Sequence, residues 1–310
     1  MSGSMIPPAG EHGGDGAAIA RSMGITPDRL LDLSASLNPF APDITSIATK
    51  FVGSLVEYPD ASIASDTLAT EISVDPRRLV LTNGGSQAIA LVAIVLGDGV
   101  VVDPEFSLYR RHLRTGDDHS SGLWRSNPAS PLGVIAADSE TATVWDEAFW
   151  PMTMGTWTRG DDTSWRLGSL TKLWACAGLR LGYVIAPDPA GADAVRSIQP
   201  RWSVNGLALA LLPELLATEK LPATATQVAA HRALFAAEVT ALGYAVADGI
   251  APWLLLQHTS GLRAAMAAHG IVVRDCTSFG LVDTHRIALP RPRDLDRVLA
   301  TLSTARPNCA

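Results

Sequence analysis

The chain has 310 residues, of which 47% are hydrophobic and 18% charged, and its formal net charge is −7. This length suggests one large domain or two of ordinary size, and the composition is that of a globular protein. The acidic balance provides no overall field that would attract nucleic acid or an anionic membrane. We therefore expect a small-molecule ligand, with neither nucleic-acid nor membrane partners.

The cysteines and histidines do not form a recognisable ligand pattern. Cys176, Cys276 and Cys309 include no C-x-x-C pair, and the seven histidines show no ligand spacing, so we predict neither a disulfide framework nor a metal site. The N-terminus lacks a basic start followed by an apolar run, and the apolar stretch "IALVAIVLGDGVVV" is interrupted well short of a membrane span. The cytoplasm is the expected location.

Short strand-like runs alternate with helical patterns through the first two thirds of the chain. The runs are "LLDLSASL" (30–37), "RLVLTNG" (78–84), "GVVVDP" (99–104), "ATVWDEAF" (142–149) and "LRLGYVIAP" (179–187), with a helix expected from Gly85. Alternation of this kind predicts an α/β protein with a mainly parallel sheet. Helices on both faces of such a sheet explain the nearly continuous Val, Ile and Leu in the runs.

The pattern changes after Pro200. Ala- and Leu-rich helices are expected around 206–219 and 223–243, followed by the strands "PWLLLQ" (252–257), "IVVRD" (271–275) and "HRIAL" (285–289), and by a closing helix from Asp294. This order predicts a second, smaller α+β domain.

Lys172 is one of three lysines among 24 basic residues, and it lies in "SLTKLWACAGLRLGY" (169–183). A deprotonated amine can form a Schiff base with a carbonyl, which a guanidinium cannot do. The hydroxyls of Ser169 and Thr171 and the fork of Arg180 are groups that bind a phosphate. The stretch therefore predicts a phosphorylated carbonyl cofactor, for which pyridoxal 5′-phosphate fits. An ordinary surface lysine is the alternative.

Two further stretches suit the same cofactor. Its pyridine nitrogen needs an anion, and Asp146 ends an apolar strand whose carboxyl end would point into the site, although such a residue can also be a helix N-cap. In "TNGGSQAIALV" (82–92), Gly85 and Ser86 open an apolar helix whose N–H groups and dipole favour a phosphate. The same pattern also occurs in ordinary loops.

In this order and spacing the residues resemble the fold-type I pyridoxal-phosphate enzymes of the aspartate aminotransferase superfamily, over nearly the whole chain. "LTNGGSQAI" resembles the phosphate loop, "VWDEAF" the segment of the pyridinium Asp, and "SLTKLWACAGLRLGY" that of the Schiff-base lysine with its phosphate-binding Ser169 and Arg180. "DPEFSLYRRHL" (103–113) resembles the segment whose aromatic stacks on the cofactor ring, which implies this role for Phe106.

The resemblance also implies an architecture. A large cofactor-binding domain is expected over residues 40–200, with a small α+β domain formed by 1–39 and 201–310. A homodimer is implied, in which Tyr58 of "EYPD" reaches the phosphate in the neighbouring subunit. Thr171 is expected to give local support beside Lys172.

Three stretches are most similar to the branch that holds histidinol-phosphate aminotransferase and the threonine-phosphate decarboxylase of cobalamin synthesis. They are "HGGD" (12–15), "LDLSASLNPFAP" (31–42) and "VVRDCTSFGL" (272–281) with the following "HRIAL". By this resemblance Arg286 grips the substrate α-carboxylate and Arg274 meets the substrate phosphate, while His12 and Asn38 line the same pocket. Without the resemblance, surface ion pairing would account equally well for the two arginines.

Two positions depart from the family pattern. Ser130 in "SNPASPLG" (126–133) stands where an Asn normally bonds the phenolic oxygen of the cofactor, and Phe149 stands where many aminotransferases have a Tyr. Loss of both donors weakens control of the pKa of the lysine imine. A non-catalytic descendant of the fold is therefore one alternative.

The S-x-x-K pattern of "SLTK" suggests another class, the serine β-lactamases and penicillin-binding proteins. That class needs a K-T-G strand as well, and the chain contains no such triplet. The preferred interpretation is O-phospho-L-threonine decarboxylation in cobalamin biosynthesis, with a histidinol-phosphate type of aminotransferase as the alternative.

Overall fold

The computed structural model describes residues 10, 12–114 and 122–305, so Cys309 lies outside the described part of the chain. The strands are β1 (Leu31–Asp32), β2 (Leu79–Asn83), β3 (Val100–Val101), β4 (Leu123–Ser126), β5 (Val144–Asp146), β6 (Trp165–Ser169), β7 (Leu181–Ile185), β8 (Ala245–Val246), β9 (Trp253–Gln257), β10 (Ile271–Val272), β11 (Arg274–Asp275) and β12 (His285–Ala288). The α-helices are α1 (Gly16–Met23), α2 (Ile44–Ala48), α3 (Ser62–Ile72), α4 (Gly84–Leu96), α5 (Leu108–His112), α6 (Trp150–Met154), α7 (Leu170–Leu173), α8 (Pro189–Ile198), α9 (Gly206–Thr218), α10 (Leu221–Ala241), α11 (Leu262–Ala267) and α12 (Leu295–Thr304).

The central sheet has six strands in the order β2-β7-β6-β5-β4-β3. The pairs β3–β4, β4–β5 and β5–β6 are parallel, whereas β7 runs antiparallel to both β6 and β2. The connection between β6 and β7 contains α7 and returns the chain antiparallel beside β6. The sheet is mixed and mostly parallel, and the predicted α/β class is confirmed.

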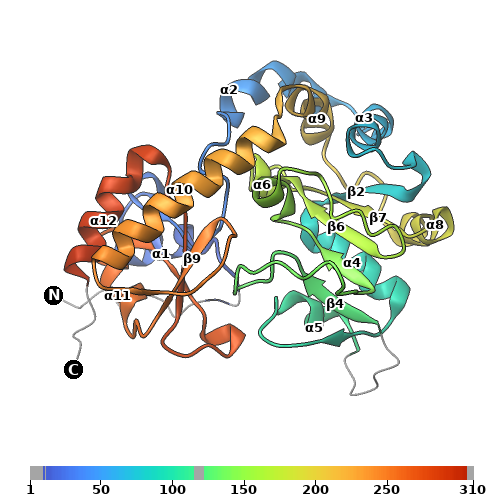
Figure 1. The fold of residues 1–310 in the computed structure, drawn as a ribbon. Coiled ribbons are helices and arrows are strands. Elements are labelled where there is room, and N and C mark those ends of the chain that lie inside the picture. The colour runs from blue at the N-terminus through green and yellow to red at the C-terminus, as the bar shows by residue number, and fades with distance from the viewer. Residues whose placement is uncertain (1–9, 11, 115–121, 306–310) are drawn as a thin grey trace.

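Helices cover both faces of this sheet. Side chains alternate between the faces along β2 and β7, as strand geometry requires. Val80 and Val184 belong to an apolar cluster with α4, α5 and α8, while Leu81 and Tyr183 belong to a second cluster with α3 and α9. In Figure 1, α4 is seen across one face of the sheet.

A separate core forms around the antiparallel sheet β11-β12-β9-β8. Phe235 of α10, Met266 of α11 and Leu302 of α12 pack with Leu254 and Ile287 of this sheet. β1, from the N-terminal segment, pairs with β10 in parallel. Figure 1 shows these elements together on the left, with α10 extending from them to α6 beside the large sheet.

The predicted domain boundary at residue 200 stays a prediction. α9, which follows that point, packs against α3 and contributes Leu211 and Leu212 to a cluster of the large sheet. α10 begins in the same cluster at Leu221 and belongs to the other core by Val239. By these contacts, the change from one core to the other occurs within α10.

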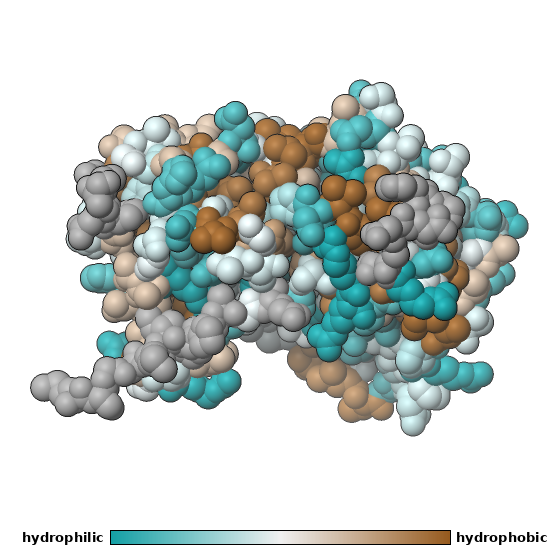
Figure 2. Space-filling model, turned by 90° about the horizontal axis from the view of Figure 1, so that it is seen from below, coloured by the Kyte–Doolittle hydropathy of each residue, from teal (hydrophilic) through white to brown (hydrophobic). Residues whose placement is uncertain are grey.

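The length and the composition of a helix decide whether it could cross a membrane. Within the described ranges, no helix is both long and apolar enough to span a bilayer. The 21-residue α10 includes the polar residues His231 and Arg232. On the face shown in Figure 2, hydrophilic and hydrophobic side chains are interspersed.

The carboxyl ends of the parallel strands meet at one edge of the large sheet. Ser126, the last residue of β4, pairs with Asp146, the last of β5. Ser169 at the end of β6 pairs with Gly182 near the start of β7. Ligands of open α/β sheets bind outside this edge, so the segments that follow these strands are the place to look for a site.

Gly182 allows three backbone segments to meet at this edge. A Cβ at Gly182 would lie 2.6 Å from the carbonyl carbon of Gly84, 2.7 Å from the nitrogen of Gly85 and 2.8 Å from the oxygen of Gly168. Backbone atoms cannot rotate away as a side chain can. The start of α4 can therefore approach β6 and β7 only because this position has no side chain.

We expect Gly182→Ala to destabilise the protein by about 1–3 kcal/mol or more, because the added methyl group forces the backbones apart. Urea unfolding measures the change. Gly178→Ala is the matched control, since no atom lies within 4 Å of a Cβ built there. Equal stability of the two variants would contradict the tight packing described.

Candidate active site

A cavity of about 450 Å³ opens at this edge, and its walls come from the large sheet and from the second core. Most of the predicted site residues line it: His12, Gly85, Ser86, Phe106, Ser130, Asp146, Ser169, Lys172, Arg180, Arg274 and Arg286. These residues are widely separated in sequence. Their convergence makes this cavity the candidate active site.

Lys172 lies on α7, half-buried in the cavity. Burial lowers the pKa of its amine to about 8, and the charges of Arg286 and Arg180 act in the same direction, while Asp146 opposes them. A lysine with this pKa has an appreciable neutral fraction near neutral pH, whereas an ordinary exposed lysine does not. The geometry therefore supplies an amine that can react with a carbonyl.

The start of α4 and Arg180 form a cradle for a phosphate. Gly84 has φ of +72°, and a Cβ there would lie 2.6 Å from Nη2 of Arg180, so the guanidinium lies directly against the first turn of the helix. Gly85, Ser86 and Ser169 line the cavity beside it. Helix N–H groups, hydroxyls and a guanidinium together suit a dianionic phosphate.

Asp146 is held in a defined orientation at the end of β5. Its Oδ2 accepts a hydrogen bond of 2.8 Å from the hydroxyl of Tyr109, and its Oδ1 accepts one of 3.0 Å from the amide of Ala148. Burial raises the pKa of the Asp146 carboxyl, and these hydrogen bonds and Lys172 oppose that effect. Burial also keeps the pKa of Tyr109 well above its usual range, so its hydroxyl stays a donor.

Arg286 on β12 is buried among groups that direct its guanidinium. Its Nη1 donates to Oγ of Ser130 at 3.2 Å, and its Nη2 donates to the carbonyl of Ser34 at 3.4 Å. The guanidinium carbon lies 5.0 Å from the ring centroid of Trp253, and burial lowers the pKa of Arg286 to about 10. None of the described groups accepts from its Nε, which leaves this buried donor for a ligand.

Arg274 pairs in register with Arg286, since β11 and β12 are antiparallel neighbours. Its Nη1 donates to the carbonyl of Gly10 and its Nη2 to Oγ of Ser278, both at 2.8 Å. His12 lies on another wall of the cavity, its ring centroid 5.3 Å from that of Phe106. Two buried arginines thus lie side by side in addition to Arg180.

The cavity is electropositive in an otherwise acidic protein. Five cationic side chains line it, against the single carboxylate of Asp146 among the described lining residues: Lys172, Arg180, Arg274, Arg286 and Arg111. A cleft lined by one sign of charge concentrates ligands of the opposite sign. The site is therefore built for a ligand with several anionic groups.

Asn38, predicted to line the pocket, is not among the cavity residues. Its Nδ2 donates to the carbonyl of Leu173 at 2.9 Å, its Oδ1 accepts from the amide of Phe40 at 2.9 Å, and its own amide donates to the carbonyl of Lys172 at 3.0 Å. Asn38 thus holds the turn that carries the lysine. Thr171 has a comparable role, because its Oγ1 accepts from the amide of Leu181 at 3.3 Å.

Tyr58 is also outside the cavity. Its side chain is 79% exposed, and its ring centroid lies 4.5 Å from that of Trp202. Such an exposed position is compatible with delivery to another subunit, and the delivery itself stays a prediction.

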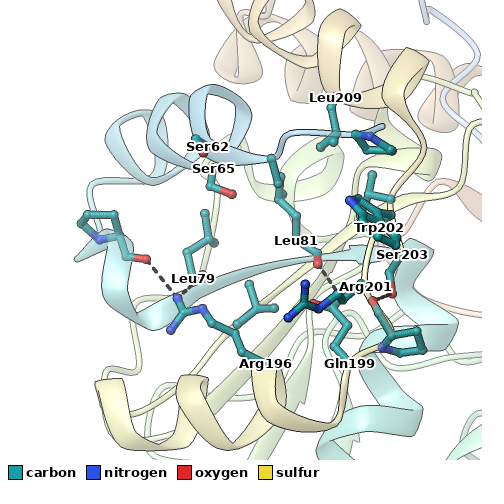
Figure 3. Close-up of a pocket in the computed structure, with 16 residues that line it drawn as sticks. Ser62, Ser65, Leu79, Leu81, Arg196, Gln199, Arg201, Trp202, Ser203 and Leu209 are labelled. Atoms are coloured by element: carbon teal, nitrogen blue, oxygen red, sulfur yellow. Dashed lines mark hydrogen bonds between the residues drawn. The ribbon is translucent and has the colours of Figure 1, made fainter. Parts of the chain in front are cut away.

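A second cavity of about 440 Å³ lies between α3, β2 and the segment around Trp202 (Figure 3). Its polar side chains serve the fold: Nη2 of Arg196 donates to the carbonyl of Leu79 at 2.9 Å, and Nε2 of Gln199 donates to that of Leu81 at 2.8 Å. None of the predicted site residues lines it, so we assign it no chemistry.

Three residues near the site are absent from the sequence-based predictions. Tyr109 follows Phe106 by three positions. Residues with this spacing lie on the same face of a helix, which is the signal that could have pointed to Tyr109. Arg111 lines the cavity from α5, the helix that also contains Tyr109. Glu105 is buried directly before Phe106, and nothing in the sequence distinguishes it from an exposed loop residue.

The two departures from the family pattern have other partners here. Oγ of Ser130 accepts from Arg286, so this hydroxyl is engaged with an arginine. The ring of Phe149 lines the cavity and packs 4.8 Å from that of Trp253, with no polar atom to offer.

The residues present fit pyridoxal 5′-phosphate. The first turn of α4 with Arg180 suits its phosphate, Phe106 offers a ring face, Asp146 an anion and Lys172 an amine for the aldehyde. The missing Cβ at Gly84 is part of this fit, because it lets the guanidinium reach the helix start.

Known proteins resemble this chain along most of its length. Histidinol-phosphate aminotransferase of Haloarcula marismortui is 28% identical over 92% of this chain and 92% of its own length. Threonine-phosphate decarboxylase of Salmonella typhimurium is 28% identical over 94% of this chain and 95% of its own length.

Solved structures show the same fold. L-threonine-O-3-phosphate decarboxylase from Porphyromonas gingivalis has a TM-score of 0.76 at 20% identity, with 89% of this chain and 99% of that chain covered. Histidinol-phosphate aminotransferase from Sinorhizobium meliloti, in complex with pyridoxal-5′-phosphate, has a TM-score of 0.76 at 16% identity, covering 92% and 93%. The family described as aminotransferase class I and II matches residues 113–302, more than half of the chain. The protein therefore belongs to the class I and II aminotransferase family.

Proposed function

We propose that the protein is a pyridoxal 5′-phosphate-dependent decarboxylase of O-phospho-L-threonine. Its family supports an enzyme with this cofactor. The observation that carries the substrate is the pair of buried arginines, Arg274 and Arg286, which line the cavity in addition to Arg180. O-phospho-L-threonine has a carboxylate and a phosphate beside its amine, so each arginine has an anionic partner.

Each group of the site then has a task. Pyridoxal 5′-phosphate, when bound, supplies an electron sink for the carbon that carries the amine. The first turn of α4 and Arg180 would hold its phosphate. Asp146, oriented by Tyr109, would keep its pyridine nitrogen protonated. Phe106 would stack on one face of the cofactor ring, and the amine of Lys172 would bind the cofactor through its aldehyde.

The direction in which Arg286 holds the substrate carboxylate decides the outcome. Where Arg286 would present the bond between the α-carbon and the carboxylate for cleavage, CO₂ would leave and Nζ of Lys172 would return a proton to the α-carbon. Where the bond to the α-proton would be presented instead, Nζ of Lys172 would accept that proton and amino transfer would follow. One bond rotation separates the two reactions.

An aminotransferase of the histidinol-phosphate type is the second candidate. It is supported by the relatives of that name, which align along 92% of the chain, against 94% for the decarboxylase. The lowered pKa of Lys172, about 8, also suits an amine that accepts a proton.

Three finer points belong to the proposal. We place the enzyme in the cytoplasm, in cobalamin biosynthesis, and as a homodimer in which Tyr58 reaches the neighbouring site. The exposure of Tyr58 supports the last point.

The substrate is tested by offering O-phospho-L-threonine without a keto acid. We expect release of CO₂ and formation of aminopropanol phosphate, because Arg274 and Arg286 can hold both anionic groups. Glutamate that forms only when 2-oxoglutarate is the amino acceptor would instead identify an aminotransferase and refute decarboxylation.

Replacement of Lys172 by Arg tests the role of the amine. The variant keeps the charge, so we expect a similar melting temperature, but it cannot form an imine and should lose turnover by several orders of magnitude. Lys220→Arg, at an exposed position, is the control and should retain activity. Turnover retained by Lys172→Arg would undo the assignment.

The pH dependence of cofactor loading follows from the pKa of Lys172. The amine reacts when neutral, so the loading rate should rise with pH, with a midpoint near the pKa of about 8. Arg286→Met removes a like charge that lowers this pKa, and its midpoint should move to higher pH. Stopped-flow absorbance after addition of the cofactor measures the rate; an unchanged midpoint in Arg286→Met would contradict the electrostatic coupling.

A further inference from the structure

Glu105 is a buried carboxyl to which the proposed mechanism assigns no task. Its side chain is 5% exposed, and none of the ion pairs in the described ranges includes it. Burial raises its pKa to about 7, and hydrogen bonds from Ser126 and Phe106 oppose that effect. A buried carboxyl without a cation is unfavourable unless hydrogen bonds satisfy it, so its partners show what it holds.

The hydrogen-bond partners of Glu105 belong to two segments that line the cavity, the one around Phe106 and the end of β4. Oε1 of Glu105 accepts from the amide of Phe106 at 3.0 Å, and Oε2 accepts from the amide of Ser126 at 2.9 Å. Oε1 also accepts from the hydroxyl of Ser126. Glu105 therefore links the segment that contains Phe106 to the end of β4.

The hydrogen bonds continue from there to the substrate arginine. Oγ of Ser126 accepts from the amide of Ser130 at 2.7 Å, and Oγ of Ser130 accepts from Nη1 of Arg286 at 3.2 Å. A hydroxyl has one proton and two lone pairs. When the hydroxyl proton of Ser126 is directed to Glu105, a lone pair on Oγ of Ser126 is free to accept from the amide of Ser130. This hydrogen bond holds Ser130 in place, and with it the Oγ that accepts from Arg286.

We infer that Glu105 is a positioning residue that acts through Ser126 and Ser130 to aim Arg286 at the substrate carboxylate. The inference rests on the proposed function, since it takes Arg286 as the carboxylate-binding group. Of the two hydrogen bonds of Arg286, the one to Ser130 is the shorter, at 3.2 Å against 3.4 Å to the carbonyl of Ser34, and it is the one that Glu105 can influence.

Glu105→Gln tests the inference, because a carboxamide has one acceptor oxygen where the carboxylate has two. With that oxygen kept toward the amide of Phe106 and the hydroxyl of Ser126, the NH₂ group faces the amide N–H of Ser126 and cannot accept from it. Two ligands are compared by the change in visible absorbance that each causes in the cofactor-loaded protein: O-phospho-L-threonine and 1-amino-2-propanol O-phosphate, which lacks only the carboxylate. We expect affinity for the first to fall about tenfold, the usual effect of a lost charged hydrogen bond, and affinity for the second to stay within about twofold.

Glu147→Gln is the matched control. Glu147 is a fully buried carboxyl whose pKa burial also raises to about 7, and it accepts from the amide of Arg159 rather than from the Ser126 series. Its replacement should lower stability without changing the ratio of the two affinities.

A double variant separates positioning from general loosening. Ser130→Ala removes the last link before Arg286, so adding Glu105→Gln to it should weaken O-phospho-L-threonine binding no further. Additive losses, or equal losses for both ligands in Glu105→Gln alone, would overturn the inference.

Failure of the proposed substrate is distinguishable from failure of the inference. If the wild-type protein binds neither phosphorylated ligand, the proposed substrate is refuted, and L-alanine with ethylamine forms the pair with and without a carboxylate. A selective loss of L-alanine affinity in Glu105→Gln would then support the role of Glu105, and an equal loss for both would overturn it.

Discussion

The close approach of β6, β7 and the first turn of α4 is the contact on which the site depends. β7 returns antiparallel to β6, so Lys172 and Arg180 lie in one connection at the carboxyl edge of the sheet. The backbone of Gly182 then touches that of Gly84 and Gly85, which brings the helix start against the guanidinium. Backbone geometry thus places the connection that carries Lys172 and Arg180 next to the first turn of α4.

The positive charge of the cavity comes in part from the sheet of the second core. Arg274 and Arg286 come from neighbouring strands of the small sheet and add positive charge opposite the amine of Lys172. Burial lowers the pKa of that amine, the charges of Arg286 and Arg180 act in the same direction, and Asp146 limits the effect. Arg286, which suits an anionic substrate, therefore also helps to keep the lysine reactive.

Much of the fold and of the site could be predicted from the sequence because the evidence was local. The alternating runs predicted the α/β class, and the family and its cofactor followed from motifs around Lys172, Asp146 and Ser86. β4 and β6 were not among the predicted runs, since "LWRS" and "WRLGS" contain an arginine and polar residues; Arg166 is buried only because Asp162 and Thr158 pair with it. Contacts across the chain were beyond reach in the same way: Asn38 bonds the lysine turn, and Tyr109 bonds Asp146 across 37 positions.

The course of α10 has a thermodynamic consequence. Its first residues pack in the apolar cluster of the large sheet and its later turns in the core around β9 and β12, so neither core is complete without this helix. Melting of one core would remove packing from the other. The two halves should accordingly unfold as one cooperative unit, although the sheets they contain share no strand.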